Sequence, residues 1–157
     1  MKKIEENLIE KLIVKGLKIS TAESCTGGMI AARITAVPGA SECFDAGVVT
    51  YSNEQKHKLI GVKTETLEQF GAVSQETALE MCKGVKELTN ADIGVSVTGI
   101  AGPGGGTPEK PVGTVWIGVC SNNTHNALKF LFEGNRDEVR SQTAEKALEL
   151  AMECIKK

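Results

Sequence analysis

The first candidate for chemistry is a run of small and polar residues, Thr21-Ala22-Glu23-Ser24-Cys25-Thr26-Gly27-Gly28. It falls where a predicted strand passes into a predicted helix, at the edge of the sheet where open α/β folds bind ligands. Ser24 could be a nucleophile presented on this tight turn. The backbone N–H groups of Thr26, Gly27 and Gly28 could bind a substrate anion or an oxyanion. The simpler alternative stays open, in which Ser24 or Thr26 only caps the helix and the glycines allow close packing.

A second candidate pair lies in the run Tyr51-Ser52-Asn53-Glu54-Gln55-Lys56, directly after an apolar strand. If this strand runs parallel beside the first one, Lys56 lies next to the Ser24 turn. Partial desolvation there would lower the pKa of the lysine and make it a usable base for a serine hydroxyl. Tyr51 could donate to a developing oxyanion or relay a proton. A surface lysine and a strand-end tyrosine without a role in chemistry are the alternative.

A glycine-rich stretch from Thr98 to Pro108 follows a third predicted strand. Its glycines would let the backbone approach a ligand closely, and we expect substrate contacts at Gly99, Gly102, Gly104 and Gly105. The stretch is not a Walker loop and lacks the G-x-G-x-x-G pattern of dinucleotide-binding folds. A flexible connection to the next strand is the alternative.

Two arginines, Arg136 and Arg140, stand one turn apart at the start of the last predicted helix. Both can therefore face the same way and could bind a phosphate. Pairing with carboxylates of the same helix, such as Asp137 and Glu138, explains them equally well.

Composition narrows the class of protein. The chain has 157 residues and a net charge of -2, which suits one domain and gives no electrostatic reason to expect nucleic acid or a membrane as partner. No run approaches the ~20 apolar residues of a membrane span, and no signal peptide is evident. The five cysteines show no C-x-x-C spacing and there are only two histidines, which argues against a disulfide framework and a metal site. We therefore expect a cytoplasmic protein with reduced thiols, no metal and no cofactor.

Helical and strand patterns alternate along the chain, which predicts an α/β fold, a three-layer α/β/α sandwich. The strands are expected at 17–22, 44–51, 93–98, 113–120 and 126–132. The helices are expected at 4–14, 26–34, 53–60, 64–69, 75–88 and 136–155. The apolar run in the second strand is typical of a buried strand. The last two strands form a predicted hairpin, so the sheet should be mixed and mostly parallel, with five to six strands.

Together and in order, these segments resemble the CinA C-terminal-domain family, the nicotinamide-nucleotide amidohydrolases of bacteria. The resemblance covers nearly the whole chain and rests on Ala22 to Gly28, Tyr51-Ser52-Asn53, Gly71-Ala72-Val73-Ser74, Thr98 to Pro103, Lys110 to Val115 and Gly134-Asn135-Arg136. It implies a single stand-alone domain that forms a homodimer. It also implies hydrolysis of nicotinamide mononucleotide to nicotinic acid mononucleotide and ammonia, in pyridine nucleotide recycling.

The resemblance places the catalytic residues at Ser24, Ser41, Tyr51, Lys56 and Thr98, with a substrate-binding arginine near Arg140. Two serines leave the nucleophile open. We prefer Ser24, because its turn and Tyr51 should share one edge of the sheet, and a relay through both serines would reconcile them. The alternative function is a nucleotide-binding module without chemistry, linked to competence or the DNA-damage response. A metal-dependent pyrophosphatase is disfavoured, because no cluster of acidic residues stands at the predicted strand ends.

Overall fold

The computed structural model describes residues 1–156, which form five strands and six α-helices. The strands are β1 (Ile19–Glu23), β2 (Phe44–Val49), β3 (Ile93–Gly99), β4 (Thr114–Cys120) and β5 (His125–Leu131). The helices are α1 (Ile4–Lys15), α2 (Met29–Thr35), α3 (Asn53–Ile60), α4 (Thr64–Phe70), α5 (Gln75–Thr89) and α6 (Arg136–Lys156), with a short 3-10 helix, η1 (Ala40–Glu42), before β2. These bounds agree with the predicted elements to within a few residues.

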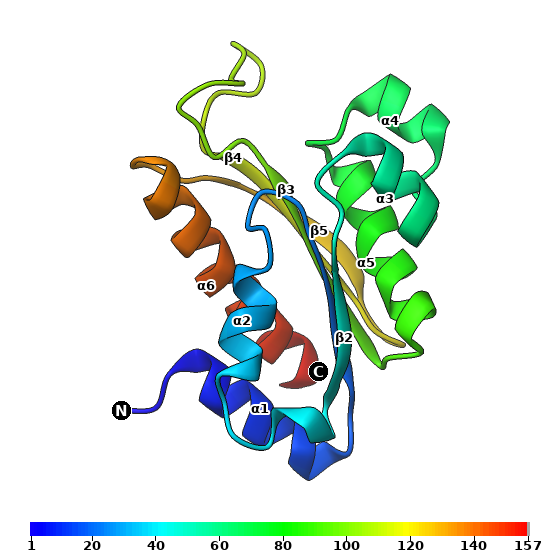
Figure 1. Ribbon diagram of the computed structural model, residues 1–157, viewed down its shortest axis with the longest axis vertical. Helices are drawn as coiled ribbons and strands as arrows, with labels where there is room; N and C mark the ends of the chain where they lie inside the picture. Colours follow the sequence, from blue (N-terminus) through cyan, green and yellow to red (C-terminus); the bar gives the residue numbers. More distant parts are fainter. Residues whose placement is uncertain (157) are drawn as a thin grey trace.

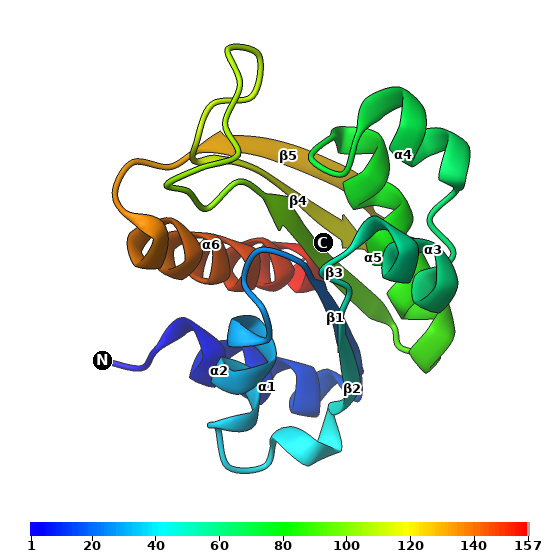
Figure 2. The same ribbon diagram turned by 45° about the horizontal axis from the view of Figure 1, so that its top comes forward.

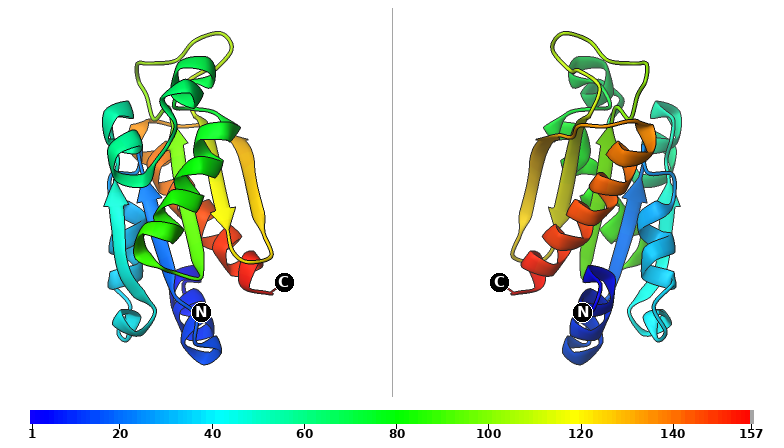
Figure 3. Two further views of the ribbon diagram at one scale, coloured as in Figure 1. Left: turned by 90° about the vertical axis from the view of Figure 1, so that its right-hand side faces the viewer. Right: turned by 90° about the vertical axis from the view of Figure 1, so that its left-hand side faces the viewer.

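The sheet is mixed, with the strand order β2-β1-β3-β4-β5. β1 pairs in parallel with both β2 and β3, whereas β4 is antiparallel to β3 and to β5. Only β4 therefore runs against the other strands, and Figure 3 shows its arrowhead at the opposite end of the sheet from those of β1, β2 and β3. The predicted mixed, mostly parallel sheet is confirmed, with five strands.

Helices cover both faces of this sheet (Figures 1 and 2). On one face α1, α2 and α6 enclose the larger core, in which Leu8, Ile30 and Leu148 are buried. On the other face α3, α4 and α5 enclose a smaller core that includes Met81 and Val85. The predicted three-layer sandwich is confirmed.

Helix α5 lies unusually close to the sheet, because glycines form the floor beneath it. A Cβ atom added at Gly94 of β3 would stand 2.2 Å from the carbonyl oxygen of Cys82, and one added at Gly118 of β4 would stand 2.6 Å from that of Ala78. No real Cβ tolerates such distances, so only glycine permits this approach. The contact holds the buried face of α5 in a fixed position over β3 and β4.

The expectation that β2 is a buried strand is wrong. It is the edge strand of the sheet, paired only with β1, and Val49 is 47% exposed. The apolar run of β2 therefore belongs to a strand that has a neighbouring strand on one side only. An apolar run alone does not distinguish an edge strand from a central one.

The structure also bears on the membrane and thiol expectations. None of the helices in residues 1–156 combines the length and the apolar character needed to cross a bilayer. All five cysteines are free thiols, and all are buried.

Candidate active site

A cavity of about 280 Å³ opens where β1, β2 and β3 end, and the loop from β3 to β4, which projects beyond this edge of the sheet (Figure 1), forms part of its wall. Its walls come from the turn after β1, the start of α3, the segment before α5, the glycine-rich loop and the first residue of α6. The lining residues are Ser24, Cys25, Tyr51, Asn53, Lys56, Ala72, Val73, Thr98, Gly99, Ile100, Ala101, Gly102, Gly104, Gly105 and Arg136. The expected site lies at the carboxyl edge of the parallel strands, as open α/β folds provide.

Lys56 and Ser24 meet at the base of this cavity. The Nζ atom of Lys56 donates to the Ser24 hydroxyl at 3.0 Å and to the Thr50 carbonyl at 2.8 Å. Helix α3 sets this position: Ser52 caps it by accepting from the backbone N–H of Gln55, and Lys56 follows one turn later. Ser24 is fixed from the other side, since its backbone N–H still donates to Val97 of β3.

The environment of Lys56 favours its neutral form. The side chain is only 1% exposed, and none of the salt bridges within residues 1–156 includes it. Burial lowers the pKa of Lys56 from 10.5 to about 8, because the charged form loses its hydration. At pH 7 roughly a tenth of the molecules then carry a neutral amine that can accept a proton.

Cys25 also lines the cavity, next to Ser24. Burial raises the pKa of its thiol to about 11, so the sulfur stays protonated at neutral pH. A protonated thiol is a weak nucleophile, which leaves Ser24 as the better candidate on the turn.

Tyr51 and Thr98 both line the cavity, but they differ in exposure and in whether the hydroxyl proton is already hydrogen-bonded. The Thr98 hydroxyl is buried and donates to the Ala72 carbonyl at 2.9 Å, so its proton is already engaged. Tyr51 is exposed at the mouth, and its hydroxyl accepts from Arg136 at 3.1 Å. The Tyr51 proton remains available to a substrate oxygen, whereas Thr98 fixes the segment before α5.

Arg136 and Arg140 of α6 have different hydrogen-bond partners. Arg136 lines the cavity, and besides Tyr51 it bonds the carbonyl of Gly102 at 2.7 Å. Arg140 instead donates to the carbonyls of Cys25 and Thr26 at 2.9 Å and 3.0 Å. Arg140 therefore ties α6 to the turn after β1 and is not among the residues that line this cavity, and the expectation that it binds substrate stays a prediction.

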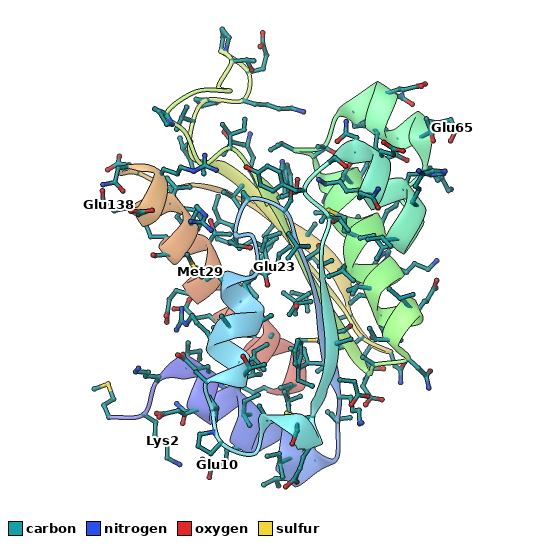
Figure 4. All side chains as sticks on the ribbon, viewed as in Figure 1. Lys2, Glu10, Glu23, Met29, Glu65 and Glu138 are labelled. Carbon is teal, nitrogen blue, oxygen red and sulfur yellow. The ribbon has the colours of Figure 1, made fainter. Side chains whose placement is uncertain are left out.

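The start of α2 is occupied by a carboxylate of the chain itself, which the sequence did not reveal. Glu23 is 1% exposed and accepts from the Thr26 hydroxyl at 2.5 Å and from the backbone N–H groups of Gly28, Ile30 and Ala31 at 3.2, 2.9 and 3.0 Å. Figure 4 shows Glu23 in the interior of the molecule, next to α2.

This cap and the turn before it occupy the backbone N–H groups of Gly27 and Gly28 that were expected to bind substrate, whereas the role expected for the backbone N–H of Thr26 stays a prediction. The Thr26 hydroxyl and the Gly28 N–H both bond Glu23, and the Gly27 N–H bonds the carbonyl of Ser24. The three residues shape the turn, since Gly27 and Gly28 have φ of +58° and +106°. A glutamate placed before a Thr-Gly-Gly turn was the available signal, because buried helix starts need acceptors.

Ser41 lies far from the cavity. It is exposed in η1, before the first residue of β2, and β2 begins beside Ile19 whereas Ser24 follows the far end of β1. The length of the strand, roughly 16 Å at 3.3 Å per residue, separates Ser41 from Ser24. Within one chain Ser41 therefore cannot relay a proton between Ser24 and Lys56.

Gly99, Gly102, Gly104 and Gly105, where substrate contacts are expected, all line the cavity. Gly102 and Gly105 have φ of +86° and +89°, which side chains rarely adopt. At Gly102 an added Cβ would also stand 2.5 Å from the side chain of Val112. The loop backbone, rather than side chains, therefore borders much of the cavity.

A three-layer α/β/α domain with a buried serine–lysine pair at the carboxyl edge of its parallel strands has the parts for acyl transfer: a hydroxyl nucleophile, a base and a cavity for the acyl group. The chain belongs to the CinA C-terminal domain family, whose sequence profile matches residues 1–155.

Individual relatives agree with this assignment. The chain is 52% identical over 140 residues to a competence-damage inducible protein of Caldanaerobacter subterraneus, covering 89% of this chain and 34% of that protein. It is 49% identical over 152 residues to a CinA-like protein of Kosmotoga olearia, covering 97% of this chain and 37% of that one. The chain thus spans little more than a third of the length of these curated relatives.

Solved structures match this chain over nearly the full length of both chains. A CinA superfamily protein of Klebsiella pneumoniae superposes with a TM-score of 0.93 at 35% identity, covering 97% of this chain and 95% of that one. The competence/damage inducible protein CihA of Agrobacterium tumefaciens superposes with a TM-score of 0.88 at 43% identity, covering 100% and 98%. The fold described above is therefore that of the family.

Proposed function

We propose that this domain hydrolyses the carboxamide of nicotinamide mononucleotide, giving nicotinic acid mononucleotide and ammonia. The observation that carries the proposal is the hydrogen bond between buried Lys56 and Ser24 at 3.0 Å. Such a pair activates a hydroxyl without histidine, because desolvation gives the lysine the pKa of a usable base. The resemblance to nicotinamide-nucleotide amidohydrolases supplies the substrate.

The first step is proton transfer from the Ser24 hydroxyl to neutral Lys56. The Thr50 carbonyl accepts one N–H of Lys56 at 2.8 Å, which leaves the lone pair of the neutral amine free to face Ser24. The Ser24 oxygen then forms a bond to the carboxamide carbon, and the C=O electron pair moves to the oxygen. The Tyr51 hydroxyl at the cavity mouth accepts from Arg136 and would donate its own proton in a hydrogen bond to this oxyanion.

Collapse of the tetrahedral intermediate breaks the C–N bond. The leaving nitrogen takes a proton from the Lys56 ammonium and departs as ammonia. Water, deprotonated in turn by Lys56, attacks the ester on Ser24 and releases the carboxylate with the serine restored. The positive charge of the pyridinium ring makes the carbonyl carbon more electrophilic, so the residues of this chain suffice for each step.

The cavity and its rim suit a mononucleotide. Its volume of about 280 Å³ is near the lower end of small-ligand sites, which start at roughly 300 Å³. Arg136 at the rim carries a positive charge with which it could meet the phosphate. The backbone of the glycine-rich loop would border the ribose, holding the amide over Ser24 and thereby raising the rate.

The test is ammonia release from nicotinamide mononucleotide by EDTA-treated protein. Wild type should release ammonia, and Lys56→Met should lose at least about a hundredfold in turnover, as expected for a general base. Lys58→Met is the matched control on the same helix, because Lys58 is exposed and pairs only with Glu54. Lys58→Met should keep wild-type turnover.

Binding of the mononucleotide by wild-type protein with no ammonia release would instead support a nucleotide-binding module. Equal turnover of Lys56→Met and wild type would reject the serine–lysine mechanism.

A further inference from the structure

A second group of reactive side chains lies at the other end of the sheet. Cys82 of α5, Cys120 at the end of β4 and His125 at the start of β5 bring two sulfur atoms and an imidazole nitrogen within 4.8 Å of one another. Cys120 pairs with Gly94 near the start of β3, whereas the end of β3 borders the cavity. Several residues of strand, roughly 15 Å, separate this cluster from the serine–lysine pair.

The fold holds the three residues in place from three different elements. Cys120 and His125 are directly opposite each other in the β4–β5 hairpin, so their side chains share one face of the sheet. Cys82 is fully buried on α5, which Gly94 holds close to the same face. The cluster is therefore part of the rigid framework, with its only exposed member at the hairpin end.

We propose that Cys82, Cys120 and His125 form a binding site for one closed-shell, thiophilic metal ion, best matched by Zn²⁺. Cysteine thiolate and histidine imidazole are the ligands that zinc prefers, and two thiolates with one imidazole leave a fourth tetrahedral position for water. His125, the exposed member of the cluster, lines a surface hollow of about 290 Å³ together with Lys83 and Glu87.

The distances are compatible with tetrahedral coordination after a small adjustment. Zinc–sulfur bonds of 2.3 Å place ligand atoms about 3.8 Å apart in a tetrahedron. The atoms of the cluster lie within 4.8 Å, so binding requires them to approach by about 1 Å at most. His125 is exposed, so rotation of its side chain can supply part of this movement.

The charges also balance. On binding, both thiols release their protons to solvent, and the two thiolates cancel the charge of Zn²⁺. Lys83 and Lys86 are both on α5, and Lys83 lines the same hollow as His125. A neutral centre is not repelled by these lysines, whereas a divalent ion held by neutral ligands would be. The Cys82 thiol, which now donates to the Leu79 carbonyl at 3.3 Å, would give up that bond for the metal.

A metal ion bound at this site would increase the stability of the folded protein. It links α5 to the β4–β5 hairpin, so an ion bound only by the folded chain favours the folded state. Because the active-site cavity lies at the other end of the sheet, we expect the same ammonia release with and without zinc. The site is thus separate from the proposed reaction, and either proposal can fail without the other.

The experiment is a titration of the reduced, full-length protein with Co²⁺, followed by the thiolate-to-cobalt charge-transfer absorption and by displacement with Zn²⁺. One ion per chain should bind and raise the melting temperature. Cys120→Ser and His125→Ala should weaken binding by at least about tenfold, as loss of a ligand does. His125 is exposed, so its variant folds even if the buried Cys82→Ser does not, and circular dichroism checks the fold of each.

Matched controls are Cys154→Ser, with the same 8% exposure as Cys120, and His57→Ala. Both should bind cobalt as wild type does. Absence of the charge-transfer band in wild type would overturn the proposal, as would equal losses in Cys154→Ser and Cys120→Ser. Three rather than five free thiols in the freshly purified, denatured protein would also overturn it, because the pair would then be a disulfide.

Discussion

The Nζ atom of Lys56 is buried, and it is also the atom that accepts the serine proton in the proposed reaction. Removal from water lowers its pKa to about 8, and the Thr50 carbonyl orients it toward Ser24. Only the neutral amine can accept the serine proton, so the active fraction of the protein should follow the titration of this one group.

We therefore predict that kcat rises with pH through an apparent pKa near 8 and reaches a plateau above it. The rate rises with pH because the neutral amine is the active form, and the lowered pKa sets the midpoint: the neutral form is the minor species below pH 8 and the major one above. Ammonia release measured from pH 6 to pH 10 at saturating mononucleotide tests this, and a rate that falls over the same interval would contradict it.

Arg136 is the only arginine on the cavity wall among the described residues, and it should recognise the phosphate of the substrate. Arg136→Gln should raise KM for the mononucleotide roughly tenfold or more, since a charge-assisted contact contributes about 1.5–3 kcal/mol. Nicotinamide riboside, which lacks the phosphate, is the control and should change little. An equal loss for both substrates would show that Arg136 acts through Tyr51 or the glycine-rich loop instead.

Sequence reasoning could place Ser24 and Lys56 together, because both follow strands whose parallel pairing was expected. It could not assign the arginines, because a spacing of one turn puts Arg136 and Arg140 on similar faces of α6. The structure separates them by what stands opposite: open cavity at Arg136, and the carbonyls of the β1–α2 turn at Arg140.

At the scale of elements, the buried cap of α2 by Glu23 organises the turn that carries Ser24. A carboxylate that accepts four hydrogen bonds offsets its own desolvation and neutralises the positive end of the helix. The same contacts bring the ends of β1 and α2 together, with Ser24 between them.

Glu23→Gln should destabilise the protein by about 2 kcal/mol or more, because the amide group turns two donors toward backbone donors. The measurement is urea unfolding. Glu65→Gln, an exposed acid in the first turn of α4 that is labelled in Figure 4, is the control and should change stability little. Equal stabilities of the two variants would contradict the role of Glu23.

Hydrophobic patterns were sufficient to find the helices and strands, because amphipathic helices bury one face and the central strands β1 and β3 are buried almost throughout. It did not show that β2 is an edge strand or that Glu23 is buried. Both facts depend on which segments meet in space, and the cysteine–histidine cluster has the same origin. Cys82, Cys120 and His125 are far from the C-x-x-C spacing of local metal sites and meet only because α5 lies on the β4–β5 hairpin.

At the scale of the whole molecule, both edges of the sheet carry exposed apolar side chains. Val49 is the last residue of β2 at one edge, and Leu131, which is 62% exposed, is the last residue of β5 at the other. Uncovered apolar edges are a common route to association. We predict the homodimer that the family resemblance implies, with a mass in sedimentation equilibrium of twice 16.7 kDa at micromolar concentration. A mass of one chain at that concentration would contradict this.

In the proposed reaction Ser24, and not Ser41, attacks the amide. The most direct measurement is ammonia release from nicotinamide mononucleotide by Ser24→Ala and Ser41→Ala, each confirmed to be folded. Ser24→Ala should lose at least about a thousandfold in turnover, as loss of a nucleophile does, whereas Ser41→Ala should stay near wild type. Full activity of Ser24→Ala, or loss of activity only in Ser41→Ala, would exclude Ser24 as the nucleophile.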